Sequence, residues 1–387
     1  MTVRAALVLV TSSFPIAGDG SEAAGAFVAD LVEALSEYIP VRVVAPGRQS
    51  ERQQWSAQIE VFRYAAPEQP LSTLRLWHPK DATATLRVLA SGARATEIAV
   101  SAGTTAHILA LWALPCGEWA RLTAARHSID YSVWTLGSDI WSLGRVPIVK
   151  LLLRRVLLQA RYCYSDGMQL KEDTERLGGR SAQFLPSTRN LVTSPRRSSR
   201  KRPPYRLLFL GRWHPNKGVD LLLAALRLLA DQEWQSIESV ELYGGGPLQQ
   251  EVEMAVDALA AAGRPVRRYG YIEKAGAEAA ITAADFLLIP SRIESIPVVF
   301  SDAVKLGCPV VAMPVGDFPL LMGEGSPCGV LARAVSADAY ADALRTALRA
   351  SPCDFENGLE LMASRFDLTS CARKLLSDFG QGESGGH

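Results

Sequence analysis

Short apolar runs alternate with longer segments of helical periodicity along most of the chain, and this alternation constrains the fold more than any other feature. Residues 5–10 (AALVLV) are uniformly apolar, residues 24–38 repeat apolar side chains at helical spacing, and residues 41–46 (VRVVAP) form the next apolar run. Strands joined by helices in this order form parallel sheets with helices on both faces. The sequence therefore predicts an α/β fold.

The alternation is interrupted once, at residues 193–204 (TSPRRSSRKRPP). This segment is basic, rich in Ser and Pro, and has no apolar periodicity, so we interpret it as a linker; a basic patch for phosphate or an anionic membrane is the alternative. A chain of 387 residues is long enough for two domains. We predict a first domain at 1–192 and a second at 205–362. Residues 363–387 should form a helix that packs back on the first domain, followed by a disordered tail.

Composition excludes several classes of protein. The chain has 41 basic and 40 acidic residues, which gives no overall field for nucleic acid. Six cysteines are scattered without metal-like spacing, as expected of buried thiols in a reducing compartment. The start reads as a first strand and not as a signal peptide, and we expect no membrane-spanning segment. The prediction is a cytoplasmic protein, either soluble or peripheral at the inner membrane face.

The segment 291–302 (SRIESIPVVFSD) follows the apolar run DFLLIP and leads into a predicted helix. We expect Ser295 to cap that helix and Pro297 to lie in its first turn. The amides of Ile296 and Val298 would then form an anion site at the start of the helix. The alternative is that Glu294 only complements the helix dipole and that the next acidic residue faces solvent.

A second loop of the same kind is GRWHPNKG, residues 211–218. It also follows an apolar run and precedes a helix. Arg212 and Lys217 flank the turn and suit the binding of a diphosphate, the first through a planar fork and the second as a point charge. The alternative is two solvated loop cations. We interpret His214 as an exposed loop residue.

Several motifs together resemble the family 4 retaining glycosyltransferases of the GT-B fold. In the second half they are FLGRWHPNKGVDLLLAAL, LYGGGPL, YGYI, ADFLLIPSRIESIPVVFSDAVKLGCPVVA and VGDFP, in that family's order and spacing. In the first half, SSFPIAGDGSEAAGAFVADLVEAL, LWALPCG and VWTLGSDIW resemble the family more weakly. The resemblance implies two Rossmann-like domains whose parallel sheets face each other across a cleft.

The resemblance also implies an activity, the retaining transfer of a sugar from a nucleoside-diphosphate sugar to an acceptor hydroxyl. Arg212 and Lys217 would neutralise the leaving diphosphate, and Glu294 would bind the donor sugar. The resemblance also implies residues that bind the phosphate, the ribose and the base, and residues that line the cleft on the side of the first domain. These are Ser295, Ile296, Pro297, Val298, Asp302, Gly244, Tyr271, Ile272, Gly25, Ser138 and Asp139.

The sequence departs from the family pattern at three places. The second acidic residue of the 291–302 segment is Asp302, where the family usually has Glu, so ribose binding should be looser or bridged by water. A histidine common before the GSD segment is absent, and Leu111 replaces a related one. Residues 186–190 read PSTRN in place of Pro-Asn-Gly-Val-Asp.

These departures leave alternatives open. One is an inactive glycosyltransferase-like partner subunit. Another is a nucleotide-sugar epimerase, for which Asp19, Glu22 and Asp139 are the only candidate acid–base groups. We expect neither metal nor cofactor, because the sequence has no Asp-x-Asp motif and no His/Cys cluster. The acceptor would be a glycan, a lipid-linked molecule or a small molecule.

Residues 148–161 (IVKLLLRRVLLQAR) form a predicted helix that is both leucine-rich and basic. Its leucines either pack in the core of the first domain, which we favour, or contact the inner membrane face beside Lys150, Arg154, Arg155 and Arg161.

Overall fold

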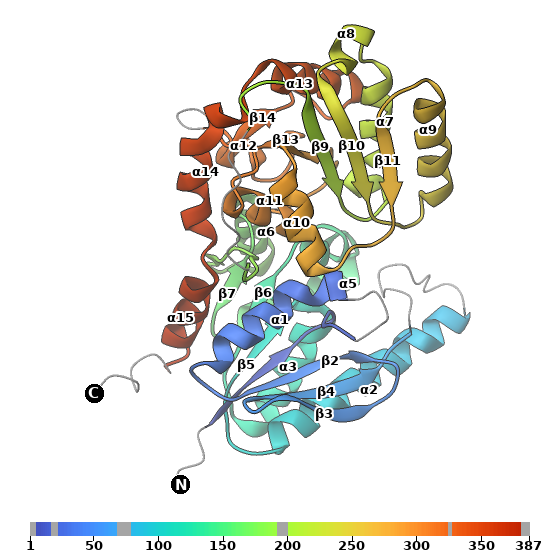
Figure 1. The fold of residues 1–387 in the computed structure, drawn as a ribbon. Coiled ribbons are helices and arrows are strands. Elements are labelled where there is room, and N and C mark those ends of the chain that lie inside the picture. The colour runs from blue at the N-terminus through green and yellow to red at the C-terminus, as the bar shows by residue number, and fades with distance from the viewer. Residues whose placement is uncertain (1–4, 17–21, 68–78, 192–199, 324–326, 381–387) are drawn as a thin grey trace. The chain divides into compact units, whose positions relative to one another are not determined.

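The computed structural model describes residues 5–16, 22–67, 79–191, 200–323 and 327–380. The chain divides into two compact units, each of which is an α/β domain (Figure 1). The first unit comprises Met1–Pro186 and Leu368–His387, and the second comprises Ser187–Asp367. The division therefore lies a few residues away from both predicted boundaries, 192 and 363.

The first unit is built on an eight-stranded sheet of order β3-β4-β2-β1-β5-β6-β7-β8. Every pairing is parallel except that of β3 with β4. The strands are β1 (Ala6–Val10), β2 (Val41–Gly47), β3 (Glu51–Ser56), β4 (Ile59–Ala65), β5 (Thr105–Leu111), β6 (Tyr131–Thr135), β7 (Cys163–Ser165) and β8 (Gln183–Phe184). The edge strand β3 was not predicted, because its sequence, ERQQWS, is polar and its side chains are mostly exposed.

Helices cover both faces of this sheet, so alternate residues of β1 belong to different cores. Val8 and Val10 pack with α2, α3 and α5, whereas Leu7 and Leu9 pack with α1 and α15. The helices are α1 (Glu22–Ser36), α2 (Pro79–Ser101), α3 (Glu118–His127), α4 (Ser138–Trp141), α5 (Pro147–Gln159), α6 (Met168–Gly178) and α15 (Leu368–Asp378).

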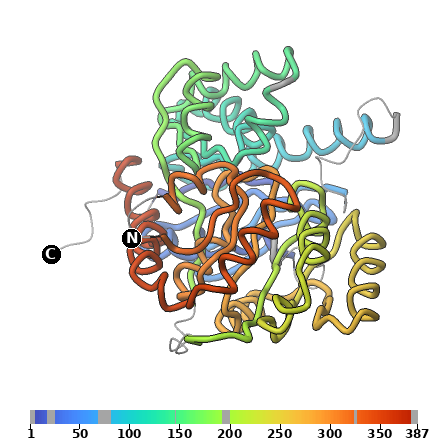
Figure 2. Tube along the Cα trace, turned by 90° about the horizontal axis from the view of Figure 1, so that it is seen from above, coloured from blue at the N-terminus to red at the C-terminus, as the bar shows by residue number. Residues whose placement is uncertain are grey.

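Helix α15 belongs to the first unit although its sequence follows the second. Figure 2 shows the red C-terminal segment beside the blue N-terminal part of the chain, and α15 packs on α1. Its apolar face, which includes Leu375 and Leu376, lies in the core next to Leu7 and Leu9. The Tyr164 hydroxyl also donates a hydrogen bond to the Asp378 carboxylate, at 2.7 Å.

The second unit is built on a fully parallel sheet of order β11-β10-β9-β12-β13-β14. The strands are β9 (Tyr205–Leu210), β10 (Ile237–Tyr243), β11 (Val266–Tyr269), β12 (Phe286–Ile289), β13 (Val310–Ala312) and β14 (Gly329–Leu331). The helices are α7 (Val219–Arg227), α8 (Asp231–Trp234), α9 (Gln249–Ala261), α10 (Lys274–Ala283), α11 (Val298–Lys305), α12 (Phe318–Leu321), α13 (Ala337–Arg349) and α14 (Glu356–Ala363).

Each sheet has a point at which the strand order reverses. In the first unit it lies between β1 and β5, and in the second between β9 and β12. Loops at the carboxyl ends of the two strands at such a point are where open parallel sheets bind ligands. In the second unit these are the loops of residues 211–218 and 290–297, the two loops that the sequence analysis selected.

Candidate functional site

The two loops of the second unit lie in direct contact. Gly218 has a φ of +68°, and a Cβ at this position would lie 1.9 Å from the carbonyl oxygen of Pro290. Only glycine allows both the left-handed backbone and this approach. The Arg292 amide also donates to the Asn216 carbonyl, at 2.8 Å. The backbone therefore brings the cations of one loop to the acid of the other.

Lys217 and Glu294 form an ion pair across these loops. The distance from Lys217 Nζ to Glu294 Oε1 is 2.5 Å, and the Ser291 hydroxyl donates to the same oxygen at 2.8 Å. The Glu294 side chain is 10% exposed and that of Lys217 is 36% exposed. Arg212 is exposed and, within the described part of the chain, pairs with no acidic side chain. The cluster thus contains two cations, of which one is still available to an anion.

Two further side chains shape the first loop. His214 Nδ1 accepts from the Asn216 amide at 3.1 Å, which caps a short 3₁₀ turn over Pro215–Lys217. Partial burial, with the charges of Arg212 and Lys217, lowers the pKa of His214, so this neutral acceptor form is favoured. His214 is therefore a turn-forming residue in the loop, but it is half-buried and not exposed as predicted.

Arg292 fastens the second loop to helix α7. Its guanidinium donates to both carboxylate oxygens of Asp220, at 2.8 and 2.6 Å, and to the Pro215 carbonyl, at 2.7 Å. Sequence reasoning missed this residue and Ser291. Both lie inside the selected segment, but nothing in the sequence shows which distant side chain each one contacts.

Helix α11 begins later than predicted. Its first residue is Val298, and its N-cap is Pro297, which has extended backbone angles. Ser295 is therefore not the N-cap, and Pro297 precedes the first turn instead of lying in it, so both predictions are wrong. The reason is that Ile296 precedes a proline, and such a residue is disfavoured in the helical region. The helix ends as expected, with Gly307 at a φ of +73° just after its C-cap.

The hydroxyl of Ser295 has no hydrogen-bond partner, although the residue is only 8% exposed. A buried polar group without a partner is unfavourable, and such groups are rare. Ser295 lies between Glu294 and the first turn of α11. This is the point at which a helix N-terminus favours an anion.

Asp302 does not lie open beside this turn. It is 1% exposed, and both of its carboxylate oxygens accept from the guanidinium of Arg189, with one distance of 3.3 Å from Nε to Oδ1. Solvation on the helix surface, the alternative considered for Asp302, is therefore wrong. A contact with ribose stays a prediction.

The residues predicted to frame a base gather around the first loop. The Gly245 carbonyl accepts from the Trp213 amide and from the Tyr271 hydroxyl, each at 2.8 Å. Gly244 lies next to this junction, while Tyr271 is exposed and Ile272 follows it. The structure thus brings Gly244 and Tyr271 next to the loop that carries Arg212, whereas among the described residues no contact of Ile272 with that loop is seen.

In the first unit, Gly25 lies in α1 where that helix crosses the loop after β1. A Cβ at this position would be 2.6 Å from the Pro15 nitrogen, so only glycine permits the approach. Ser138 is exposed at the start of α4. Asp19 and the side chain of Glu22, candidates for an epimerase, lie outside the described residues.

Asp139 is buried and binds backbone. Its carboxylate accepts from the amides of Ala113 (2.7 Å), Ile140 (3.2 Å) and Leu136 (3.3 Å). Burial raises the pKa of Asp139 to about 6, against the effect of these hydrogen bonds. Asp139 therefore joins the loops after β5 and β6.

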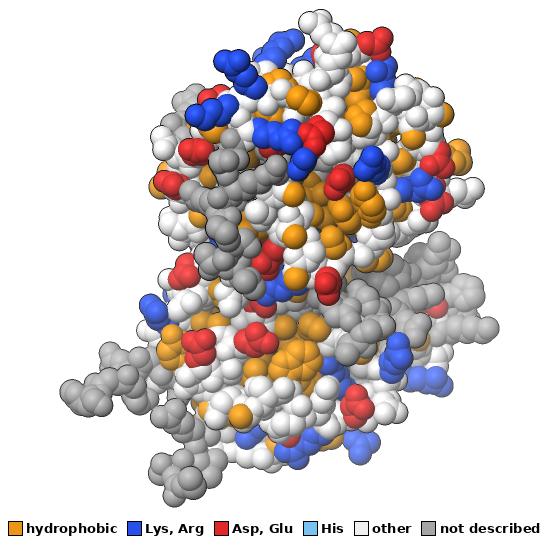
Figure 3. All heavy atoms as spheres, in the orientation of Figure 1, with side chains coloured by type: hydrophobic (Ala, Val, Ile, Leu, Met, Phe, Trp, Pro, Cys, Tyr) orange, Lys and Arg blue, Asp and Glu red, His pale blue; other side chains and the backbone are white. Residues whose placement is uncertain are grey.

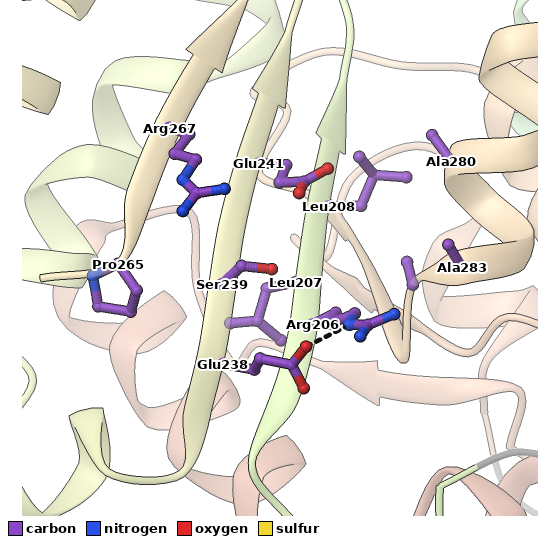
Figure 4. A pocket seen from close by; sticks show the side chains of 11 residues that line it. Arg206, Leu207, Leu208, Glu238, Ser239, Glu241, Pro265, Arg267, Ala280 and Ala283 are labelled. Atoms are coloured by element: carbon purple, nitrogen blue, oxygen red, sulfur yellow. Dashed lines mark hydrogen bonds and ion pairs between the residues drawn. The ribbon is translucent and has the colours of Figure 1, made fainter.

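A hollow of about 300 Å³ lies elsewhere in the second unit, on the face of β9, β10 and β11 beside α10 (Figure 4). Arg206 pairs there with Glu238 at 2.6 Å, and Figure 3 shows acidic, basic and apolar side chains intermixed over this face. The hollow lies at the amino-terminal halves of the strands, away from the loops at their carboxyl ends. We assign the candidate site to the loops, because ligands of such sheets bind there.

The described ranges contain no cluster of three or more His, Cys, Asp or Glu side chains that could hold a metal ion. No helix in them is both long and apolar enough to cross a lipid bilayer.

Comparison with known proteins agrees with this geometry. Residues 204–350 match the model of a family described as "Glycosyl transferases group 1". A D-inositol 3-phosphate glycosyltransferase of Mycolicibacterium gilvum is 28% identical over 178 residues, or 45% of this chain. The match spans only 38% of that relative's length. The family match lies within the second unit.

The similarity in fold extends over nearly the whole chain. Sucrose-phosphate synthase from Thermosynechococcus elongatus has a TM-score of 0.69 at 18% identity, covering 98% of this chain and 99% of its own. The trehalose-6-phosphate protein of E. coli, bound with UDP-2-fluoro glucose, has a TM-score of 0.74 at 12% identity, covering 97% and 99%. The predicted resemblance to GT-B glycosyltransferases is confirmed, and so is the fold class of two α/β domains with parallel sheets.

Proposed function

We propose that the protein is a glycosyltransferase that takes a sugar from a nucleoside-diphosphate sugar and transfers it to an acceptor hydroxyl. The observation that carries this proposal is the cluster at the switch point of the second unit. Lys217, Glu294 and Ser291 are joined there by short contacts, and Ser295 offers a buried hydroxyl without a partner at the start of α11. Cations, an acid and a helix N-terminus together suit a sugar diphosphate.

Each of these groups has a proposed role. Lys217 and the exposed Arg212 would neutralise the diphosphate as negative charge develops on it. Glu294, already oriented by Lys217 and Ser291, would accept hydrogen bonds from hydroxyls of the donor sugar. The turn Ser295–Val298, which includes Ile296 and Pro297, would face the phosphate.

The remaining contacts are proposed from the family resemblance. Gly244, Tyr271 and Ile272 would frame the base. The resemblance assigns Asp302 to the ribose, but in this structure its carboxylate is occupied by Arg189. Gly25, Ser138 and Asp139 would belong to the acceptor side, although the structure gives Asp139 a backbone role as well.

The proposed reaction retains the configuration at the anomeric carbon. The bond from that carbon to the diphosphate oxygen breaks first, leaving an oxocarbenium-like sugar. The acceptor oxygen attacks from the same face, and its proton passes to an oxygen of the departing diphosphate. Two protein cations aimed at the leaving group would stabilise this step, and we propose that they do so without a metal ion.

A thermal-shift titration with UDP, GDP, ADP and dTDP tests the proposal. At least one of the four should raise the unfolding temperature in a saturable way, since a ligand that binds only the folded state stabilises it. Lys217→Ala should reduce that shift, whereas Lys171→Ala, which removes a half-exposed ion pair with Glu175 in the first unit, should not. A wild-type protein that responds to none of the four contradicts the proposal.

Peripheral contact with the inner membrane face is part of the same proposal, and helix α5 supports it. Leu153, Val156 and Leu157 are buried in the core of the first unit, as the favoured interpretation predicted. Ile148 and Leu151, however, are 81% and 70% exposed.

The helix also carries Lys150, Arg154 and Arg155, all exposed. Exposed apolar and basic side chains on one helix suit an anionic lipid surface. The protein should therefore co-sediment with vesicles of phosphatidylglycerol and phosphatidylcholine, and less with phosphatidylcholine alone. Ile148→Ser with Leu151→Ser should release it; equal sedimentation with both vesicles excludes the electrostatic contribution.

A further inference from the structure

Helix α11 is held by a segment that precedes it in the chain by more than a hundred residues. Ser187, Thr188 and Arg189 open the second unit, and all three are buried. Arg189 donates to both oxygens of Asp302 on α11, and the Asp302 side chain is 1% exposed. A planar guanidinium that meets a carboxylate at two points fixes orientation as well as distance.

The next turn of the helix is bound to the same segment. Lys305 Nζ donates to the Thr188 hydroxyl at 2.7 Å and to the Arg189 carbonyl at 2.5 Å. The Thr188 hydroxyl donates in turn to the carbonyl of Phe366, at 2.9 Å. Two positions on α11, three residues apart, thus contact the same buried segment, Thr188 and Arg189.

These ties lie one turn from the candidate phosphate site. Val298, the first residue of the helix, and Asp302 are four residues apart and so lie on the same face. The helix has eight residues, from Val298 to Lys305. A constraint on the rotation of so short a helix at Asp302 also sets the direction of the amides in its first turn.

We propose that Arg189 is a positioning residue for the donor site, and that Asp302 binds Arg189 instead of ribose. The inference rests on the proposed function, since it assumes a diphosphate at the start of α11. Removing one partner of a buried ion pair leaves an uncompensated charge, which displaces the helix or the segment. The amides of the first turn then no longer point at the phosphate.

The two roles of Asp302 predict opposite results for Arg189→Gln. If Asp302 positions the helix, losing Arg189 weakens the binding of the diphosphate. If Asp302 instead binds ribose and Arg189 competes for it, losing Arg189 frees the carboxylate and strengthens the binding of any nucleoside.

The experiment measures UDP and uridine binding by NMR titration for wild type, Arg189→Gln, Asp302→Asn and the double variant. If ADP binds wild type more tightly than UDP does, ADP and adenosine are used in place of UDP and uridine. We expect each single variant to weaken UDP binding at least tenfold and to change uridine binding less than twofold. The double variant should be no worse than either single variant, because both changes break the same contact. Arg345→Gln, which breaks a pair with Glu233 (2.8 Å) elsewhere in the second unit, should leave both affinities unchanged.

Three outcomes contradict the inference alone. They are unchanged UDP binding in both single variants, an equal loss for UDP and uridine, and stronger binding in Arg189→Gln. If Arg189→Gln does not fold, Arg189→Lys is used in its place, because lysine keeps the charge but lacks the planar fork. Arg189→Lys should likewise lower the affinity for UDP and not the affinity for uridine. If wild type binds no nucleoside diphosphate, the proposed function fails, and this inference fails with it.

Discussion

Each unit places an acidic residue shortly after a strand of its parallel sheet, Glu294 after β12 and Asp139 in α4 after β6, and uses it differently. In the second unit Glu294 contacts side chains, Lys217 and Ser291, in a partly open cluster. In the first unit Asp139 is fully buried and accepts from three backbone amides of its own and a neighbouring loop. One carboxylate takes part in a charged cluster, and the other organises loops.

The difference shows what a strand-exit loop needs in order to bind a charged ligand. Around Glu294, Arg212 stays exposed and the Ser295 hydroxyl has no partner, so polar groups remain for a ligand. Around Asp139 the carboxylate is surrounded by amides that it already satisfies. Shared topology alone therefore does not make both loops binding sites, and charge and hydrogen-bond satisfaction distinguish them.

The largest expected effect is a loss of transferase turnover. If it is not observed, the contrast between the two loops does not hold. Lys217→Ala and Arg212→Ala should each lower transferase turnover by about 10²–10³-fold, since one contact that stabilises developing charge contributes about 3–4 kcal/mol. Turnover would be measured with the donor identified by the nucleotide titration. Lys171→Ala serves as the control, and circular dichroism checks the fold. Activity within threefold of wild type in both variants would make this loop structural, like that of Asp139.

The second prediction concerns the other loop. Asp139→Ala removes an acceptor of three backbone amides, of which that of Ala113 is buried and that of Ile140 keeps the Gly137 carbonyl as a second acceptor. The free energy of unfolding should fall by about 3 kcal/mol, since each unsatisfied group costs about 1–3 kcal/mol. Urea denaturation measures it. Asp139→Asn keeps one acceptor oxygen and should lose less. A change below about 0.5 kcal/mol in the alanine variant would show that water replaces the carboxylate.

The third prediction concerns the pH dependence of stability in the first unit, where a buried histidine has a structural role. His107 is buried, lies 2.8 Å from the Ser132 hydroxyl through Nε2 and stacks on Phe379. Burial, with the charge of Arg161, lowers the pKa of His107 to about 3. Below pH 6.5 the unfolded chain gains a proton that the folded one does not, so stability falls as pH falls from 6.5 towards 3.

Between pH 7 and pH 5 this protonation should cost wild type about 2 kcal/mol relative to His107→Gln, which does not titrate. Asp139 acts in the opposite direction over the same range, because its pKa is raised and its protonation favours the folded state. It is present in both proteins, so the difference between them isolates His107. Parallel pH profiles in urea denaturation would contradict the prediction.

The smallest expected effect is that of metal removal, which should leave transferase activity unchanged. If protein cations neutralise the diphosphate in the second unit, transferase activity should persist in excess EDTA. Loss of activity that Mg²⁺ or Mn²⁺ restores would show that Arg212 and Lys217 are not sufficient.

The sequence predicted the fold well because both units follow one pattern of apolar strands and amphipathic helices. It missed β3, since a polar antiparallel edge strand has no such pattern. It selected both loops of the candidate site, because each follows an apolar run, precedes a helical pattern and carries charged residues.

The sequence could not predict ion pairs between side chains that are distant in the chain. Arg189 and Asp302 are 113 positions apart, and Arg189 was noted only as part of a departure from a family motif. The start of α11 was a different error. The effect of a proline on the residue before it was available in the sequence, and Ile296 could have been excluded from the helix.

The position of α15 has a consequence for synthesis. Its residues line the core of the first unit, yet the ribosome makes them after the whole of Ser187–Asp367. The second unit can therefore fold on the emerging chain while the first still lacks one layer of its core. Until α15 arrives, the apolar face beside α1 is open to chaperones and to aggregation, so nascent chains halted before Leu368 should be the most vulnerable.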